Sequence, residues 1–478
     1  MSIFLTEIVF PHRSLSSETI DENTLSLPAI EPSWFRELVA DLSLLADMAD
    51  VVGGPFHVVF PQQFVANLNA FNRAISSAGL DGRVMFAKKA NKAGAWLQAC
   101  AETGAGVDVA SAEELVHALA RGVRGTDLVV TGPAKGDRLL WLAVRHGCLL
   151  AVDALDELDR LLALVPDSEH ARIVLRVLPE VNPDSRFGFA PTELEVALNR
   201  CVQERARVSM EGFSFHLNGY RVESRAQLAD QLVDSLLEAR DRGLAATSIS
   251  IGGGFAVSYF HAETWQRFLE KNQRRELDAD FHAGKTFDQF YPYHQSPTGA
   301  DMLTAILSSE SSSGSETVGE KFVRTGTKML LEPGRALLDR AGCTVFPVQG
   351  FKRRGNYGIT TVDGLSMSVS EQWKSSEFLP DPILWPPQRS GETAPTEPVR
   401  SAVAGASCLE YDLLTWRKVV LSREPRHGDL LIYPSTAGYQ MDKNESEFHG
   451  HRLPPKVVVT LDEQGKFHWQ LDENGYQA

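Results

Sequence analysis

Apolar residues along the first two thirds of the chain alternate between two patterns, one typical of helices and one typical of buried strands. Helical spacing appears first, at Phe64, Leu68, Phe71 and Ile75. A short uninterrupted apolar run at 84–87 follows, then an amphipathic stretch at 93–103 and another short run at 107–109. Short apolar runs that alternate with amphipathic helices are typical of parallel sheets with helical crossovers.

The same alternation continues to residue 331 and predicts eight strands. We expect these strands at 84–87, 107–109, 128–131, 149–152, 173–177, 212–216, 248–251 and 328–331. Helical patterns lie between several of them, at 112–121, 137–146, 155–164, 192–205 and 227–242. Eight strand units with helical connections favour a closed (β/α)8 barrel over an open sheet, so the predicted fold class is α/β.

The character of the sequence changes after Arg335. Short strand patterns separated by turns rich in Gly and Pro predict an all-β domain, a sandwich or a barrel, and they lie at 345–349, 419–421, 430–433 and 456–460. We therefore expect a barrel domain at 55–335 and a second domain formed by 1–54 packed with 336–478. The Ser-rich stretch 308–317 is expected to be a mobile surface loop inside a long insertion at 261–324, and the Pro-rich stretch 380–398 is also expected to be a loop.

Composition excludes several classes of protein. The chain has 478 residues, 43% of them hydrophobic and 23% charged, which is ordinary for a folded protein. It holds 47 Lys and Arg against 62 Asp and Glu, a net charge of −15, so a nucleic-acid binder is disfavoured. The N-terminus lacks the basic segment and cleavage site of a signal peptide, and no apolar run of about 18 residues occurs. We expect a cytoplasmic protein with no membrane span.

Cysteine and acidic residues do not predict a metal site. The five cysteines are scattered and form no CxxC pair, so neither a zinc knuckle nor a disulfide framework is expected. No His, Asp and Glu set has metal-ligand spacing.

Polar residues gather directly after the predicted barrel strands, where the active sites of such barrels lie. From the first strand to the last, they are Lys89, Asp108, Arg176, His216, Gly252–Gly254 and Glu332. Each has an ordinary explanation when taken alone: a lone lysine is usually solvated, a lone histidine is usually a core residue, and a glycine run is often only a turn. Several of them converging on one rim favours an active site.

Three of these features have specific chemical uses. The triple glycine can point backbone N–H groups at a phosphate, and Arg335, on the same turn as Glu332, can bind a phosphate oxygen. Alternatively, Glu332 and Arg335 form only a surface ion pair. Lys89 on the rim can form a Schiff base with an aldehyde.

Five motifs occur in order and carry a family resemblance: FAKKAN (86–91), GVDVAS (106–111), TGPAK (131–135), GGGF (252–255) and EPGR (332–335). Together they resemble the pyridoxal-phosphate (PLP) decarboxylases of the alanine-racemase-like fold, the ornithine, diaminopimelate and arginine decarboxylase family. The resemblance runs over most of the chain and is closest to diaminopimelate decarboxylase-like proteins.

The resemblance implies a role for each motif residue. Lys89 matches the lysine that binds PLP as a Schiff base, and His216 matches the histidine that stacks on its ring. Gly252, Gly253, Gly254 and Arg335 match the phosphate site, and Glu332 matches the carboxylate at the pyridine nitrogen. Asp108, Glu114 and Arg176 match residues around the lysine and the ring. Cys408 and Tyr439 come from the second domain: Cys408 resembles the proton donor that reaches the site from the other subunit of a homodimer, and Tyr439 resembles a cofactor contact.

The expected activity is decarboxylation of an L-amino acid. A carboxylate at the ring nitrogen keeps it protonated and deepens the electron sink. Racemases of this fold place an arginine there, so Glu332 disfavours the alternative of a racemase or epimerase. A second alternative is a catalytically silent regulator that resembles these decarboxylases. The presence of Lys89, Glu332 and Cys408 disfavours it.

Three departures from the family concern the phosphate and the substrate. The run after His216 reads HLNGY (216–220) and lacks the usual serine. Leu409 stands where an acidic residue usually follows the cysteine, with Glu410 and Asp412 nearby. The segment PILW (382–385) lacks the usual arginine and has Trp385 in place of a tyrosine. Glu410, Asp412 and Trp385 are therefore candidate substrate contacts, and the substrate is expected to be diaminopimelate-like or another substituted amino acid.

Overall fold

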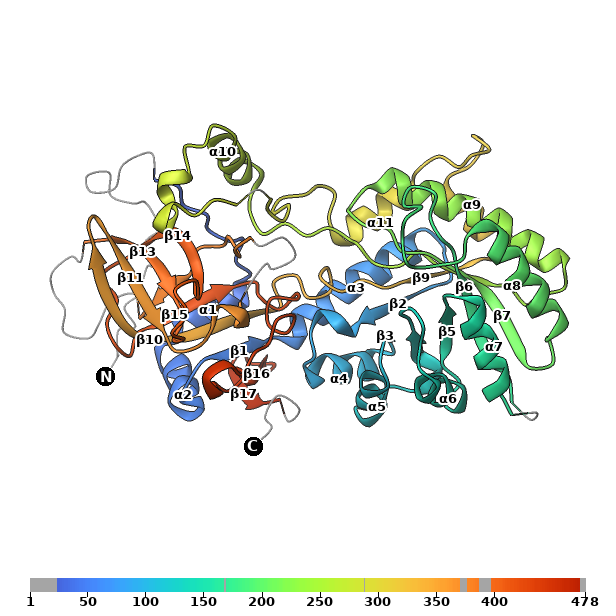
Figure 1. The fold of residues 1–478 in the computed structure, drawn as a ribbon, viewed down its shortest axis with the longest axis horizontal. Helices are drawn as coiled ribbons and strands as arrows, with labels where there is room; N and C mark the ends of the chain where they lie inside the picture. Colours follow the sequence, from blue (N-terminus) through green and yellow to red (C-terminus); the bar gives the residue numbers. More distant parts are fainter. Residues whose placement is uncertain (1–23, 167–168, 288, 370–375, 387–396, 473–478) are drawn as a thin grey trace.

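The computed structural model describes residues 24–166, 169–287, 289–369, 376–386 and 397–472. Figure 1 shows two bodies side by side, a helix-wrapped barrel and a twisted sheet, joined by several passages of the chain. The first 23 residues and most of the Pro-rich stretch fall outside the described ranges.

Eight parallel strands close into the predicted barrel, which confirms the α/β fold class. The strands are β2 (Gly82–Ala87), β3 (Gly106–Val109), β4 (Leu128–Val130), β5 (Leu149–Val152), β6 (Ala171–Arg176), β7 (Val208–Ser214), β8 (Ser248–Ser250) and β9 (Lys328–Leu331). The barrel closes where β2 pairs with β9, with Val84 opposite Leu331. His216 was expected at the end of the sixth strand, but it lies two residues beyond β7, in the turn that follows.

Helices cover the outside of the barrel, as the amphipathic pattern predicts. They are α3 (Pro61–Ser77), α4 (Gly94–Thr103), α5 (Ala112–Ala120), α6 (Asp137–Arg145), α7 (Leu155–Leu164), α8 (Pro191–Gln203) and α9 (Val222–Asp241). The insertion before β9 adds α11 (Gly299–Leu307) and α12 (Val318–Thr325) to this cover, whereas its first helix, α10 (Ala262–Gln273), lies beside the second body (Figure 1). Because α11 packs against both α3 and α9, the insertion supplies the helical cover between β8 and β9.

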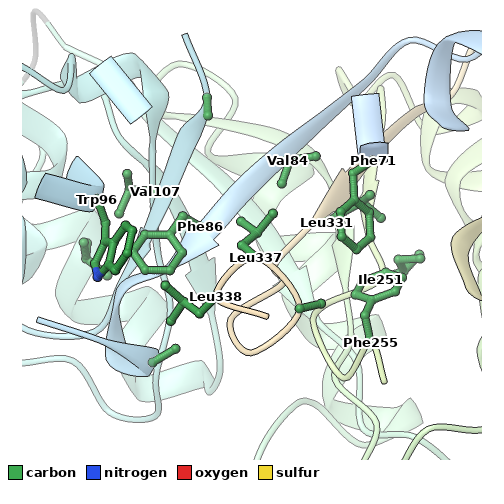
Figure 2. Close-up of a cluster of buried hydrophobic side chains, with 14 of the residues drawn as sticks. Phe71, Val84, Phe86, Trp96, Val107, Ile251, Phe255, Leu331, Leu337 and Leu338 are labelled. Carbon is green, nitrogen blue, oxygen red and sulfur yellow. The ribbon is translucent and has the colours of Figure 1, made fainter. Parts of the chain in front are cut away.

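The barrel core holds β2 in place beneath the rim. Figure 2 shows Phe86 on β2 beside Trp96 and Val107, with Val84 on the same strand facing Leu337. The rings of Phe86 and Trp96 both pack against Phe64, at centroid distances of 5.1 and 5.4 Å. All three rings are fully buried. This packing fixes the position of β2 and therefore of the residues that follow Ala87.

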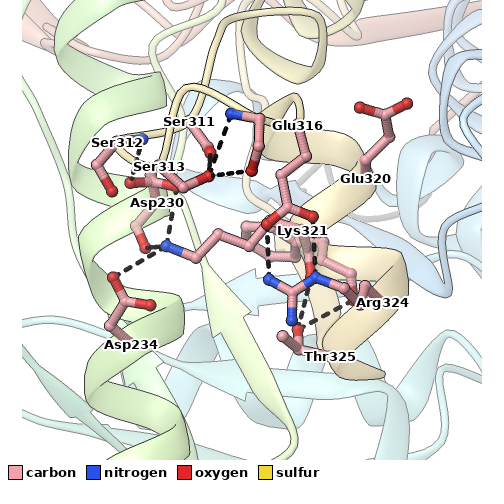
Figure 3. Close-up of polar contacts among 12 residues, drawn as sticks. Asp230, Asp234, Ser311, Ser312, Ser313, Glu316, Glu320, Lys321, Arg324 and Thr325 are labelled. Carbon is pink, nitrogen blue, oxygen red and sulfur yellow. Dashed lines mark hydrogen bonds and ion pairs between the residues drawn. The ribbon is translucent and has the colours of Figure 1, made fainter.

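The Ser-rich stretch 308–317 is tied to the barrel rather than extending freely from it. The N–H of Ser312 donates to Asp230 on α9 (3.1 Å), and the buried Lys321 bridges Asp230 and Asp234 at 3.0 and 2.9 Å (Figure 3). Thr317 caps α12 through the N–H of Glu320. The bonds to the carboxylates are charge-assisted and hold Ser312 against α9, and the cap joins Thr317 to α12.

The second body is one connected sheet of nine strands, mostly antiparallel. The strands are β1 (Phe56–Val59), β10 (Gly342–Arg354), β11 (Tyr357–Val362), β12 (Ile383–Trp385), β13 (Val399–Ala404), β14 (Leu413–Leu421), β15 (Leu430–Pro434), β16 (Lys456–Leu461) and β17 (Phe467–Leu471). Although β1 falls inside the range 55–335 expected for the barrel, it pairs with β10 and β16 of this sheet.

Two N-terminal helices, α1 (Ser33–Ala40) and α2 (Leu42–Val52), pack on this sheet. Trp34, Phe35 and Leu38 share a buried cluster with Val345, Ile432 and Val457 of three different strands. The described N-terminal residues therefore bury their apolar side chains against the C-terminal part of the chain. None of the helices in the described ranges is long and apolar enough to cross a membrane.

The Phe86→Ala variant is expected to lose about 3–5 kcal/mol of unfolding free energy, because it leaves a cavity beneath the rim. Urea unfolding followed by circular dichroism measures this loss. The control is Val196→Ala on the outer face of α8, where the side chain is 52% exposed, and its expected change is within about 0.5 kcal/mol. Equal losses in the two variants would show that Phe86 does not carry this packing.

Candidate active site

The first and last barrel strands bring a lysine and a glutamate to the same part of the rim. Beyond β2 the chain forms a single 3-10 turn, η1 (Lys88–Ala90). The N–H of Ala87 donates to the carbonyl of Pro333 at 3.2 Å, which joins the end of β2 to the residue after Glu332. The second body fixes the other side of the turn, because the N–H of Tyr439 donates to the carbonyl of Ala90 at 2.8 Å.

Asp108 is the nearest acidic partner of Lys89. The Lys89 Nζ lies 3.8 Å from Asp108 Oδ2, and the Lys89 side chain is 50% exposed whereas that of Asp108 is 2% exposed. Thr131 donates its hydroxyl to Asp108 Oδ1 at 2.6 Å, which fixes the carboxylate. Burial acts to lower the pKa of Lys89, but the charge of Asp108, with Tyr439 and Glu332, outweighs burial, and the pKa is raised. Lys89 is therefore a cation in the free protein.

Glu332 lies at the end of β9 and is held by the neighbouring strand. Ser250 donates its hydroxyl to Glu332 Oε1 at 2.6 Å, and the N–H of Glu332 donates to the carbonyl of Gly252 at 2.9 Å. Burial, followed by the negative charge of Asp108, raises the pKa of Glu332 above its ordinary value. This carboxyl therefore retains a proton more readily than an exposed one, and it is suited to share a proton with a basic nitrogen.

The adjacent Lys88 has a different environment. Its side chain is buried, and burial lowers its pKa. The charges that act on it are Glu114 and Asp442 rather than Asp108 and Glu332. Of the two neighbouring lysines, only Lys89 has its ammonium group among the acidic residues of the rim.

His216 and Arg176 lie on the next part of the rim. Burial, followed by the cations Lys89 and Arg176, lowers the pKa of His216 to about 3. His216 is therefore neutral, and its Nδ1 accepts from the N–H of Gly253 at 3.4 Å. Arg176 donates to Asp153 at 3.3 Å and stacks on the Phe187 ring at 4.3 Å.

The triple glycine leaves a cradle that side chains would fill. A Cβ on Gly252 would lie 2.5 Å from the carbonyl of Phe215, and one on Gly253 would lie 2.6 Å from the carbonyl of Glu332. Gly254 has φ +78°, and a Cβ there would overlap Arg225. Only glycine allows the backbone to approach the neighbouring loops this closely, and that approach is what a phosphate-binding loop requires.

Arg335 and Tyr439 complete the rim from opposite bodies. Arg335 is buried and donates to the Tyr259 hydroxyl at 2.9 Å and the Gly438 carbonyl at 3.2 Å. Its guanidinium also lies 4.2 Å from the Tyr291 ring centroid and 5.0 Å from that of Tyr439. The structure thus brings together the rim candidates: Lys89, Asp108, Arg176, His216, Gly252–Gly254, Glu332, Arg335 and Tyr439.

The remaining candidates lie in the second body. Cys408 is exposed, and its described contact is with His449 (Sγ to Nε2, 3.1 Å) rather than with Lys89. Glu410 is also exposed. Asp412 is buried and accepts from the N–H groups of Ser366 and Ser407 at 2.8 and 3.2 Å, so it holds its own loop.

Trp385 is not part of the rim. It lies on β12 in the buried cluster beneath α1 and α2, and its indole N–H donates to the carbonyl of Val39 at 3.0 Å. Within the described chain, its side chain and that of Asp412 have structural partners, so we leave both out of the substrate site.

The structure adds residues that the sequence pattern did not reveal. Ser250 positions Glu332, His449 contacts Cys408, and Arg225 lies behind the triple glycine. A serine at the end of a strand beside the rim is a signal for the first. An arginine at the start of an amphipathic helix is normally solvated, so nothing in the sequence marks Arg225.

An amine, a proton-retaining carboxyl and a glycine cradle on one rim fit the three ends of PLP. Lys89 suits its aldehyde, Glu332 its pyridine nitrogen, and Gly252–Gly254 its phosphate. No group of three or more His, Cys, Asp or Glu side chains in the described ranges could hold a metal ion.

Known proteins resemble this chain in sequence and in fold. The sequence model of the pyridoxal-binding domain of pyridoxal-dependent decarboxylases matches residues 62–286. The uncharacterised protein y4yA of Sinorhizobium fredii is 37% identical over 442 residues, 91% of this chain and 95% of that protein. Diaminopimelate decarboxylase of Bacillus subtilis is 25% identical over 460 residues, 90% of this chain and 91% of the relative.

Among solved structures, diaminopimelate decarboxylase of M. jannaschii in complex with L-lysine has the same fold. The TM-score is 0.69 at 20% sequence identity, covering 89% of this chain and 91% of the other.

His216 is expected to stay neutral between pH 8 and pH 5 in the cofactor-free protein, because burial and nearby cations depress its pKa. NMR of the protein labelled with ¹⁵N-histidine measures this, and the signal lost in His216→Asn gives the assignment. A titration of that signal near pH 6.5, the ordinary value for histidine, would contradict the lowered pKa expected in this environment.

Proposed function

This chain belongs to the family of PLP-dependent ornithine, arginine and diaminopimelate decarboxylases, and from that premise we propose which of its residues perform the chemistry. It is a PLP-dependent amino-acid decarboxylase. The observation that carries the proposal is the place of Lys89, whose Nζ lies 3.8 Å from Asp108 and whose strand is joined to the residue after Glu332 by the bond between Ala87 and Pro333.

When bound, PLP supplies an electron sink for the α-carbon that loses its carboxylate. Lys89 would hold the cofactor through its aldehyde carbon until the amine of the substrate takes its place. Glu332 would share a proton with the pyridine nitrogen, and Ser250 keeps its carboxyl in place. The neutral, partly buried ring of His216 would pack against the face of the cofactor ring, and Arg335 and the triple glycine would bind the phosphate.

The proton that returns to the α-carbon needs a donor, and we assign it to Cys408. In a single chain Cys408 is exposed and contacts His449. We therefore propose a homodimer in which Cys408 of one copy reaches the rim of the other. The imidazole of His449, 3.1 Å from the thiol, is placed to return a proton to the sulfur after transfer.

Decarboxylation fits this site better than racemisation. A racemase of this fold relies on an arginine at the ring nitrogen, whereas this site offers the carboxyl of Glu332. A silent regulator would have no need for Lys89, Asp108 and Glu332 to be arranged together.

The substrate is an L-amino acid, diaminopimelate-like or otherwise substituted. Leu409 replaces the acidic residue that reads the far end of the substrate in the family, and Asp412 is committed to its loop. The far end is therefore recognised by other groups than in those relatives. A cytoplasmic location fits the five cysteines, none of which forms a disulfide.

The test is CO2 release from diaminopimelate, lysine, ornithine and arginine, with the amine product identified by mass. Lys89→Met is expected to abolish both CO2 release and the visible absorption of the bound cofactor. Lys88→Met is the matched control, since it removes the adjacent lysine, and it is expected to keep the absorption. Retention of the band in Lys89→Met, or its loss only in Lys88→Met, would refute the assignment of Lys89.

A further inference from the structure

Arg225, in the first turn of α9, is a fully buried cation without an acidic partner among the described residues. Its guanidinium donates instead to backbone carbonyls: Nη2 to Leu217 (3.0 Å) and Gly219 (2.8 Å), Nε to Gly253 (3.3 Å), and Nη1 to Arg221 (3.3 Å). Burial lowers its pKa to about 10. Burying an uncompensated charge is unfavourable, so a nearby anion would stabilise this arrangement.

The guanidinium lies between the two loops of the expected phosphate site. One is the HLNGY loop after β7, which lacks the serine usual in the family, and the other is the triple glycine after β8. A Cβ on Gly254 would overlap Arg225 Nη2, so the glycine and the arginine depend on one another.

The bonds to Arg225 determine where the N–H groups of these loops point. In a planar trans peptide, the C=O of one residue and the N–H of the next point in opposite directions. Because the carbonyls of Leu217, Gly219 and Gly253 face the guanidinium, the N–H groups of the residues that follow, Asn218, Tyr220 and Gly254, face away from it. In the described part of the chain, none of these three N–H groups donates a hydrogen bond.

We propose that Arg225 is the positioning residue of the phosphate cup. It aims the N–H groups of Asn218, Tyr220 and Gly254 at the cofactor phosphate, and its charge balances that of the phosphate, in place of the serine hydroxyl missing from the HLNGY loop. Backbone N–H groups left without a partner in neighbouring loops are suited to bind an anion. This inference rests on the proposed function, since it takes PLP as the cofactor.

The experiment compares PLP with pyridoxal, which has the same ring and aldehyde but no phosphate. Both are titrated into the cofactor-free protein and followed by absorption. Arg225→Met is expected to weaken PLP binding about tenfold to a hundredfold, the range for a lost charge-assisted hydrogen bond, and to leave pyridoxal binding within about twofold. Arg225→Lys keeps the charge but cannot contact all the carbonyls. It is therefore expected to weaken PLP binding relative to pyridoxal binding, but by less than Arg225→Met.

Arg240→Met is the matched control. Arg240 lies on the same helix and also donates to carbonyls, those of Ala246, Thr325 and Gly326, but at the other end of α9. This variant is expected to keep the wild-type ratio of PLP to pyridoxal affinity. If Arg225→Met keeps the wild-type ratio of PLP to pyridoxal affinity, the proposal is overturned. If Arg225→Met does not fold, the same ratio measured in Arg225→Lys decides.

A second measurement separates this inference from the proposed function. Inorganic phosphate at constant ionic strength is expected to raise the melting temperature of the wild-type and Arg240→Met proteins without cofactor, and to leave that of Arg225→Met unchanged. If phosphate stabilises all three equally, Arg225 has no part in the cup. If the wild type shows the phosphate effect but binds no PLP, the proposed function fails while the anion site stands.

Discussion

The closure of the barrel between β2 and β9 is the constraint on which the site depends. It places the end of the first barrel strand against Pro333, so that Lys89 and Glu332 meet although 243 residues separate them in the chain. Asp108 on the next strand then supplies the charge that keeps Lys89 protonated and, at the same time, raises the pKa of Glu332. At Glu332 burial is the larger cause of the raised pKa and Asp108 adds to it, so one buried carboxylate influences the protonation of both side chains.

The second body contributes to the site in two ways. Its loop at 436–440 holds η1 through the bond between Tyr439 and Ala90, and the side chain of Asn91 donates to the carbonyl of Ala437 at 2.8 Å. It also carries the Cys408 and His449 pair away from the rim of its own chain. The strand β1 connects the two bodies as well, because it pairs with β10 and β16 of the sheet and leads directly into α3 of the barrel.

Local patterns were sufficient for the barrel and for most of the rim. Buried parallel strands are short apolar runs, and the residues that follow them reach one end of the barrel, so Lys89, the triple glycine and Glu332 could be predicted. The pairing of β1 with β10 joins segments nearly 300 residues apart, and no local pattern encodes it. Arg225 was missed because its burial requires the HLNGY loop before it to fold against the triple glycine, 28 residues further along the chain. The contact of Trp385 with Val39 joins opposite ends of the chain, so no local pattern encodes it either.

The most direct test of the central claim is chemical trapping of the cofactor on its lysine. The PLP-loaded protein is reduced with borohydride and digested, and the labelled peptide is identified by mass spectrometry. The geometry of the rim predicts that the label lies on Lys89. A label on Lys88 or on the buried Lys135, or no label on any lysine of the loaded protein, would contradict it.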